Sequence, residues 1–183
     1  MSSLKEQITI IGFRNVEIEN IDTFLEGFRN EKNPPIQFFN AKHIAGSQHI
    51  FFATLNALNS FNKKKNISNN LAVEVLLYAS AQRQITKAVN MLGIKKDSSE
   101  VAVLIFSENC SNTTEYLKLV TNSISGKRDD NVLELTNKKC VIIKKLFEIS
   151  DLEFEAKLQK EGQEKEALTD LVIERMAILG IKC

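Results

Sequence analysis

The sequence is poor in the residues that metal sites and disulfide frameworks need. Its 183 residues include three cysteines, two histidines, two prolines and no tryptophan. Cys110, Cys140 and Cys183 are an odd number of thiols spread far apart, which predicts reduced cysteines rather than a disulfide framework. No two Cys or His residues combine with a second pair at zinc-finger spacing. We therefore expect neither a disulfide-rich nor a metal-binding protein.

Motifs for cofactor binding and catalysis are also missing. The seven glycines are scattered singly, so there is no glycine-rich phosphate loop. The chain has neither a GxSxG nor an HExxH segment. Its adjacent carboxylates, Asp129 and Asp130, lie in a charged turn. These absences predict a protein with no cofactor and no enzymatic activity.

Long apolar runs are absent too. No apolar segment approaches the roughly 18 residues that a membrane span requires. Met1 to Gln7 show no charged leader joined to a long apolar stretch, as a secretory signal would have. We expect a cytoplasmic protein with no membrane partner.

The residues that are present predict one folded domain over residues 1–183. The apolar fraction is 43% and the net charge is +1, which is typical of a chain with a sizeable core. Apolar and β-branched runs predict strands at Ile8–Phe13, Ile36–Phe39 and Val101–Phe106, and a short strand at Val132–Leu135. Helical periodicity and capping residues predict helices at Asp22–Arg29, Ser47–Phe61 (with Ser47 as N-cap), Leu71–Ala79, Gln82–Leu92, Thr113–Ile124, Lys138–Phe147, and from Leu152 to the end, interrupted at Gly162. This alternation predicts an α/β fold with a small mixed β-sheet of about three to five strands flanked by helices.

Charge is divided unevenly along the chain. Residues 1–96 hold 12 basic and 7 acidic residues, whereas residues 97–183 hold 12 and 16. Between Asn40 and Lys96 there are eight basic residues and a single acid, Glu74. A basic stretch of this kind is typical of a surface that contacts phosphate. The alternative is that Lys63, Lys64 and Lys65 only solvate a loop.

The helix around His49 has a polar side and an apolar side. At 100° per residue, His49 falls opposite the broad apolar face, with Phe52 at the edge of that face. We therefore expect His49 near solvent or a partner, where an imidazole and a phenyl ring form a platform for stacking unpaired bases. Alternatively, Phe52 packs under another helix and His49 caps a loop.

The last helix is apolar on two sides. One stripe comprises Leu168, Leu171, Val172, Met176 and Leu179, and a second comprises Ile173, Ala177 and Ile181. A helix of this pattern is either buried all round or docked against another protein.

Several of these segments together resemble a known family. They are Glu74 to Ile85 (EVLLYASAQRQI) followed by Ala88 and Gly93-Ile94, the upstream Asn40-Ala41 with Ala45 and His49-Ile50, and the late Ile173-Glu174-Arg175-Met176-Ala177. Their order and spacing over residues 8–181 are similar to the PRPK-binding protein (TPRKB) family, accessory subunits of the KEOPS complex, in its archaeal type.

The resemblance implies a non-catalytic subunit. In that family the complex installs threonylcarbamoyladenosine on tRNA, and the resemblance implies that the present chain docks on the N-lobe of the kinase-like ATPase subunit, a PRPK homologue, and helps capture tRNA by its single-stranded 3′ CCA end. We expect an RNA-binding surface that comprises Asn40, Lys42, His49, Phe52, Lys63, Lys64, Lys65, Arg83 and Lys87, with Arg83 and Lys87 on one helix face at i, i+4. We expect partner contacts at Ser80, Gln82, Gln84, Ile173, Met176, Ala177 and Ile181.

Two other functions stay open at this point. One is a small-molecule-binding or enzymatic α/β domain with a pocket near His49. The other is a purely structural scaffold that binds no RNA.

Overall fold

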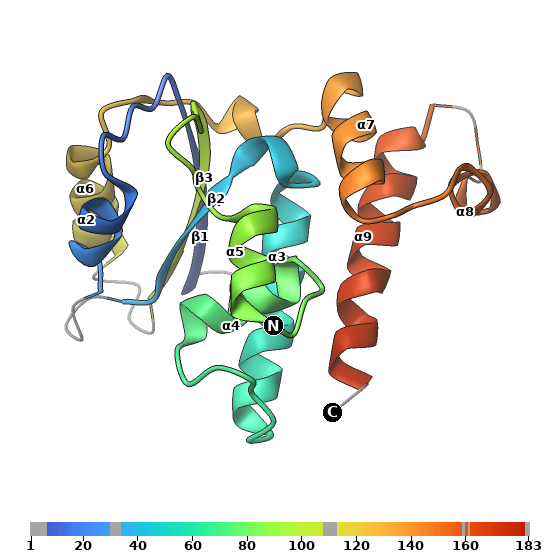
Figure 1. The fold of residues 1–183 in the computed structure, drawn as a ribbon, viewed down its shortest axis with the longest axis horizontal. Helices are drawn as coiled ribbons and strands as arrows, with labels where there is room; N and C mark the ends of the chain where they lie inside the picture. The colour runs from blue at the N-terminus through green and yellow to red at the C-terminus, as the bar shows by residue number, and fades with distance from the viewer. Residues whose placement is uncertain (1–6, 30–33, 108–112, 159, 161, 182–183) are drawn as a thin grey trace.

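A four-stranded sheet lies between two layers of helices in our computed structural model, which describes residues 7–29, 34–107, 113–158, 160 and 162–181 (Figure 1). The strand order is β2-β3-β1-β4, and every pairing is antiparallel. The strands are β1 (Ile8–Arg14), β2 (Ile36–Asn40), β3 (Glu100–Phe106) and β4 (Lys127–Arg128). The α/β fold with a small sheet flanked by helices, which the sequence predicts, is confirmed.

The helices cover both faces of the sheet. Figure 1 shows α2 and α6 on one face, α3, α4 and α5 on the other, and α7, α8 and α9 beyond α3. Their bounds, with two short 3₁₀ turns, are α2 (Ile21–Glu26), η1 (Ala41–His43), α3 (Gly46–Asn62), α4 (Leu71–Ala79), α5 (Ile85–Leu92), α6 (Thr113–Ser123), η3 (Asp130–Leu133), α7 (Asn137–Leu146), α8 (Asp151–Lys157) and α9 (Glu164–Ile181). None of the helices described is long and apolar enough to cross a bilayer.

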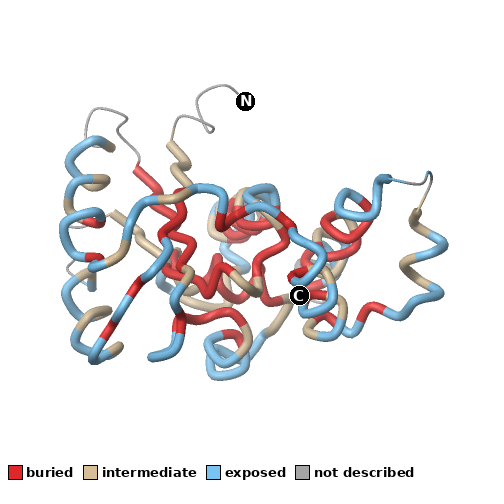
Figure 2. The backbone as a smooth tube through the Cα atoms, turned by 90° about the horizontal axis from the view of Figure 1, so that it is seen from above, coloured by how far each residue is buried: buried red, intermediate tan, exposed pale blue. Residues whose placement is uncertain are grey.

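Alternation along the strands divides the apolar residues into two cores. Val103 of β3 faces the α2–α6 layer, while its neighbours Ala102 and Leu104 face α3, α4 and α9. Because helices cover both faces, β3 is buried almost throughout, which explains its continuous apolar run. Figure 2 shows the buried residues concentrated at the sheet and the helices beside it, with α8 at the exposed periphery.

Three local predictions are wrong. The segment predicted as a strand at Val132–Leu135 begins with the turn η3, which is capped because the Asp129 side chain accepts a hydrogen bond from the Asn131 N–H. Helix α3 begins at Gly46 after Ala45, so Ser47 lies inside it and caps nothing. Helix α5 begins at Ile85 rather than at Gln82.

Candidate functional site

The lysine loop, Lys63 to Lys65, is held in one conformation where α3 ends. The Lys64 N–H donates to the carbonyl of Phe61 at 3.0 Å, and the Lys65 N–H donates to that of Ser60 at 2.9 Å. These two bonds are those of a Schellman motif, which places Lys64 at the left-handed position with a φ of 54°. All three lysines are exposed. A cluster of three positive charges is thus presented on an ordered turn.

Glu74 fixes the segment that follows the lysine loop. Its side chain is fully buried and accepts hydrogen bonds from the backbone N–H groups of Ile67, at 3.1 Å, and Ser68, at 2.8 Å. A carboxylate bonded to backbone donors in a dry site holds its loop firmly. The single acid of the basic stretch therefore bonds to the backbone of its own loop, and among the described residues no ion pair joins it to the exposed lysines.

Arg83 and Lys87 lie farther along the same layer. Both are exposed. Because α5 begins at Ile85, Arg83 precedes the helix, and the prediction that the two residues share a helix face is wrong. Arg83 lies just before α5 and Lys87 lies in its first turn, and of the two glutamines before the helix Gln84 is exposed and Gln82 is half-buried.

Asn40 and Lys42 lie at the other end of α3 from the lysine loop. A helix of 17 residues spans about 25 Å, so the predicted RNA-binding residues do not form one compact patch. The Asn40 side chain is buried and accepts a hydrogen bond from the Lys42 N–H at 3.2 Å. The Lys42 ammonium lies 3.5 Å from the Ser99 hydroxyl. Asn40 thus has a local structural role, and only Lys42 of this pair carries a charge.

His49 is not near solvent, and that prediction is wrong. Its side chain has no exposed surface. Nδ1 accepts from the Ala45 N–H at 3.1 Å, and Nε2 lies 2.8 Å from the Ala79 carbonyl, to which it donates. Burial lowers the pKa of His49 to about 4. The neutral ring therefore ties the start of α3 to the end of α4.

The predicted stacking platform does not form. The ring of His49 packs edge-to-face on Phe147, with centroids 5.6 Å apart. Phe52 is 39% exposed and packs on Phe51 instead. A fully buried imidazole has no face to offer a base, so His49 leaves the candidate RNA surface.

The turn after α4 mixes core and surface residues. Ser80 is fully buried, and its hydroxyl donates to the Leu77 carbonyl at 3.1 Å. The next residue, Ala81, has a φ of 52°. The expectation that Ser80 contacts a partner directly therefore does not hold, whereas Gln82 and Gln84 are accessible.

The two stripes of α9 have different environments. Met176 is fully buried in the main core, so its predicted partner contact is wrong and its stripe belongs to the fold. On the other side Ile173 is half-buried, Ala177 is exposed and Ile178 is 43% exposed. The side chain of Ile181, at the end of the helix, lies outside the described residues. Helix α9 thus keeps an accessible apolar side after its inner face is packed.

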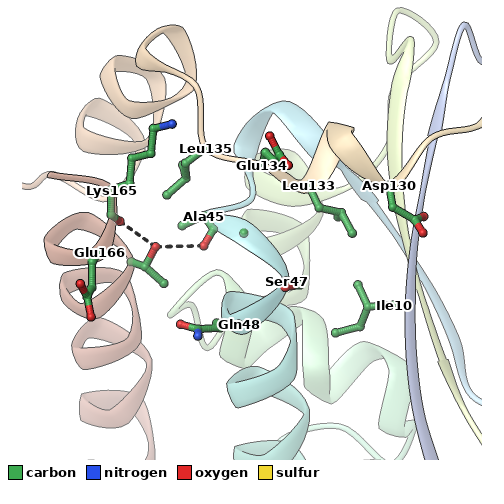
Figure 3. A pocket seen from close by; sticks show the side chains of 12 residues that line it. Ile10, Ala45, Ser47, Gln48, Asp130, Leu133, Glu134, Leu135, Lys165 and Glu166 are labelled. Carbon is green, nitrogen blue, oxygen red and sulfur yellow. Dashed lines mark hydrogen bonds between the residues drawn. The ribbon is translucent and has the colours of Figure 1, made fainter. Parts of the chain in front are cut away.

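A cavity of about 720 Å³ lies where α3 and α9 begin (Figure 3). Charged Asp130, Glu134, Lys165 and Glu166 line it together with Ala45, while His49 does not. The hydrogen bonds drawn there run from the Thr169 hydroxyl to the carbonyls of Ala45 and Lys165. Among the described residues, no group of three or more His, Cys, Asp or Glu is placed to hold a metal ion. A cavity thus does lie near His49, at the residues that directly precede it, but the buried imidazole does not line it.

Comparison with known proteins identifies relatives over most of the chain. A family profile described as "Kinase binding protein CGI-121" matches residues 13–180. The chain is similar to "Regulatory protein Cgi121" of Methanocaldococcus jannaschii, with 31% identity over 140 residues, which cover 76% of this chain and 83% of the relative. It is also similar to "EKC/KEOPS complex subunit CGI121" of Candida albicans, with 25% identity over 185 residues, 92% of this chain and 90% of the relative.

Proposed function

We propose that this chain, which belongs to the CGI-121 family of kinase-binding proteins, is a non-catalytic subunit of a KEOPS tRNA threonylcarbamoyladenosine-modification complex. In this role it binds the kinase-like ATPase subunit and helps recruit tRNA by its single-stranded 3′ CCA end. The names of its relatives, one a KEOPS subunit and one a regulatory protein, support the accessory role. The observation that carries the proposal is the accessible apolar side of α9, which remains after Met176 and its stripe have formed the core.

The kinase-like subunit binds this outer side of α9. Ile173 and Ala177 are one turn apart there; Ile173 also packs in part against the core, and Ile178 is a further exposed apolar residue of the same helix. The ion pairs Lys157–Glu174 at 2.6 Å and Arg175–Glu153 at 2.7 Å link α8 to α9, while the buried stripe that contains Met176 holds α9 to the core. A helix anchored on one face with an open apolar side is a suitable docking surface for a helix or sheet of a partner.

Substitutions on α9 test the docking surface. Ile173→Glu and the more exposed Ala177→Glu should abolish co-elution with the recombinant kinase-like subunit, while circular dichroism and the melting temperature of Ala177→Glu stay those of the wild type. Val141→Glu on α7 is the matched control, because Val141 is 71% exposed and lies outside α9, and it should bind normally. Undiminished co-elution of Ala177→Glu would remove α9 from the interface.

tRNA contacts the lysine loop and, farther along, Arg83 and Lys87. The favourable binding free energy comes largely from counterions that are released when these charges neutralise phosphates. Because the lysine loop is ordered by backbone bonds and by Glu74, little conformational entropy is lost on binding there. Lys42 contributes at the opposite end of α3, about 25 Å away. A tRNA is long enough to contact both ends of the helix at once, whereas a single nucleotide is not.

The salt dependence of tRNA affinity tests this surface. For the lysine-loop variant (Lys63, Lys64 and Lys65 all changed to Glu) the slope of log affinity against log salt, which is negative, should become shallower by about 2 to 3. Arg83→Glu with Lys87→Glu should make it shallower by about 1 to 2. The charge-matched control, Lys138→Glu with Lys145→Glu on exposed positions of α7, should leave the slope unchanged. The lysine-loop variant should also lose the preference for a tRNA with an intact CCA end. An unchanged slope for this variant would mean that these lysines only solvate their loop.

A further inference from the structure

The outer edge of strand β2 has backbone groups with no strand beside them. In the β2–β3 ladder Gln37 is opposite Leu104 and Phe39 is opposite Ala102. The Phe106 N–H donates to the Pro35 carbonyl, so residues 35, 37 and 39 are the ones whose backbone groups turn toward β3. The N–H and C=O groups of Ile36 and Phe38 therefore point away from the sheet. Strand β2 stands at one end of the strand order, so no described strand pairs with them.

This edge has only part of the protection that natural sheets give an edge strand, since β2 is short, Pro34 and Pro35 precede it, and residues of α4 and α5 lie beside it. Natural sheets also block such edges with charged side chains, prolines within the strand or bulges. The strand Ile-Gln-Phe-Phe-Asn contains no charge and no proline, and its register with β3 is unbroken. The one local device is the Gln37 side chain, whose amide donates to the Phe38 carbonyl at 2.9 Å. A competing backbone donor can displace such a flexible amide.

An apolar groove of about 440 Å³ runs along the same edge. Leu25 of α2 and Phe28, in the turn after α2, form one wall, and Ile85 and Val89 of α5 form part of the other. Ile85 and Val89 are 47% and 44% exposed, although both are large apolar residues one turn apart. The groove thus offers apolar walls on both sides of a strand edge, as a chain in extended conformation requires for its alternating side chains.

The charge at the groove indicates what such a chain carries. Arg29 also lines the groove and is exposed. Among the described residues no carboxylate forms an ion pair with it. An acidic side chain on the bound segment would supply the missing counter-charge.

We propose that the β2-edge groove, lined by Leu25, Phe28, Arg29, Ile85 and Val89, binds an extended acidic-apolar segment of a partner protein, which adds to the sheet as a fifth strand beside β2. The segment exchanges hydrogen bonds with the backbone of Ile36 and Phe38. Its alternate apolar side chains pack on the α2 wall and on the α5 wall, and its carboxylate pairs with Arg29. This surface is separate from the outer side of α9 and from the lysine loop, and it shares only helix α5 with the proposed tRNA contact at Lys87, so the inference does not depend on the proposed function.

Selection of peptides from a displayed random library of twelve-residue segments tests the groove on the full chain. The wild type should enrich sequences with apolar residues at alternate positions and an Asp or Glu at one end. Synthetic copies of these peptides should bind about tenfold more weakly to Val89→Glu and with wild-type affinity to the matched control Val141→Glu, which places the same charge on exposed α7. Arg29→Glu should enrich peptides with Lys or Arg in place of the acid.

Amide hydrogen exchange then shows whether the bound peptide is a strand. Binding should slow exchange at Ile36 and Phe38 while Gln37 and Phe39, already bonded to β3, change little. Three results would each overturn the proposal. They are the absence of any enriched pattern, enriched peptides that bind Val89→Glu and the wild type alike, and concentration-dependent dimers that protect the same two amides without peptide. Competition of the peptides by a CCA oligonucleotide at this groove would assign it to RNA instead and would also overturn the proposal.

Discussion

Acidification should weaken this fold by a predictable amount through a single side chain. His49 is neutral in the folded chain, because Nδ1 accepts from the Ala45 N–H and Nε2 donates to the Ala79 carbonyl. Burial lowers its pKa from 6.5 to about 4, against the opposing effect of the bond to Ala79. Between those two pH values the unfolded chain takes up a proton that the folded chain excludes, so stability is complete above pH 6.5 and is lost as the pH falls toward 4. The full loss is about 3 kcal/mol, and about 2 kcal/mol of it is reached at pH 5.

Urea unfolding at pH 7.5 and pH 5.0 measures this loss. Carboxylates also titrate in this pH range, so the informative quantity is the difference between the wild type and His49→Gln in the free energy of unfolding lost between the two pH values. The wild type should lose about 2 kcal/mol more than His49→Gln between the two pH values. His43→Gln, which removes the other imidazole of the chain, is the matched control and should keep the loss that His49 causes. Equal losses in wild type and His49→Gln would refute the reasoning, as would an imidazole of His49 that titrates near 6.5 by NMR.

Three further substitutions test the packing around the two proposed surfaces. Lys64→Gly should raise the free energy of unfolding by about 1 kcal/mol, because a φ of 54° favours glycine; Lys64→Ala, which keeps the Cβ, should not, and equal urea midpoints for both variants would contradict the strain. Glu74→Gln should lower that free energy by about 1 to 3 kcal/mol, since the neutral amide loses the charge-assisted bonds to the Ile67 and Ser68 N–H groups and places an NH2 donor where a carboxylate oxygen now accepts; wild-type stability would show that the buried bonds do not hold the loop. Met176→Ala should cost about 2 to 5 kcal/mol in thermal or urea unfolding, and a cost below 1 kcal/mol would be inconsistent with its complete burial.

Strands with a strong apolar signal could be predicted from the sequence, whereas a strand that forms only by pairing with a neighbouring strand could not. The run in β3 predicted a buried strand because both of its faces are covered. Strand β4 is two exposed residues, Lys127 and Arg128, and only pairing with β1 makes it a strand. The segment at Val132 has a strand-like composition, but the cap at Asp129 turns it into η3.

In the candidate site, too, features set by local sequence could be predicted, whereas features set by long-range packing could not. Charge counting predicted the exposed lysine loop, because lysines at a helix end stay in water. Periodicity placed His49 opposite the main apolar face but did not show that this side is also covered. Its carbonyl partner, Ala79, is 30 residues away, and such long-range bonds leave no local signal. The stripe that contains Met176 was visible as apolar, and only the packing of α9 shows which of its two stripes is the core.

We propose that the chain holds the kinase-like subunit and tRNA at the same time on separate surfaces. Sedimentation velocity of labelled tRNA, the wild-type chain and the recombinant kinase-like subunit measures this directly. We predict that adding the kinase-like subunit shifts the tRNA–chain species to a larger one that contains all three components. Release of tRNA as the kinase-like subunit binds would show that the two surfaces coincide and would contradict the account.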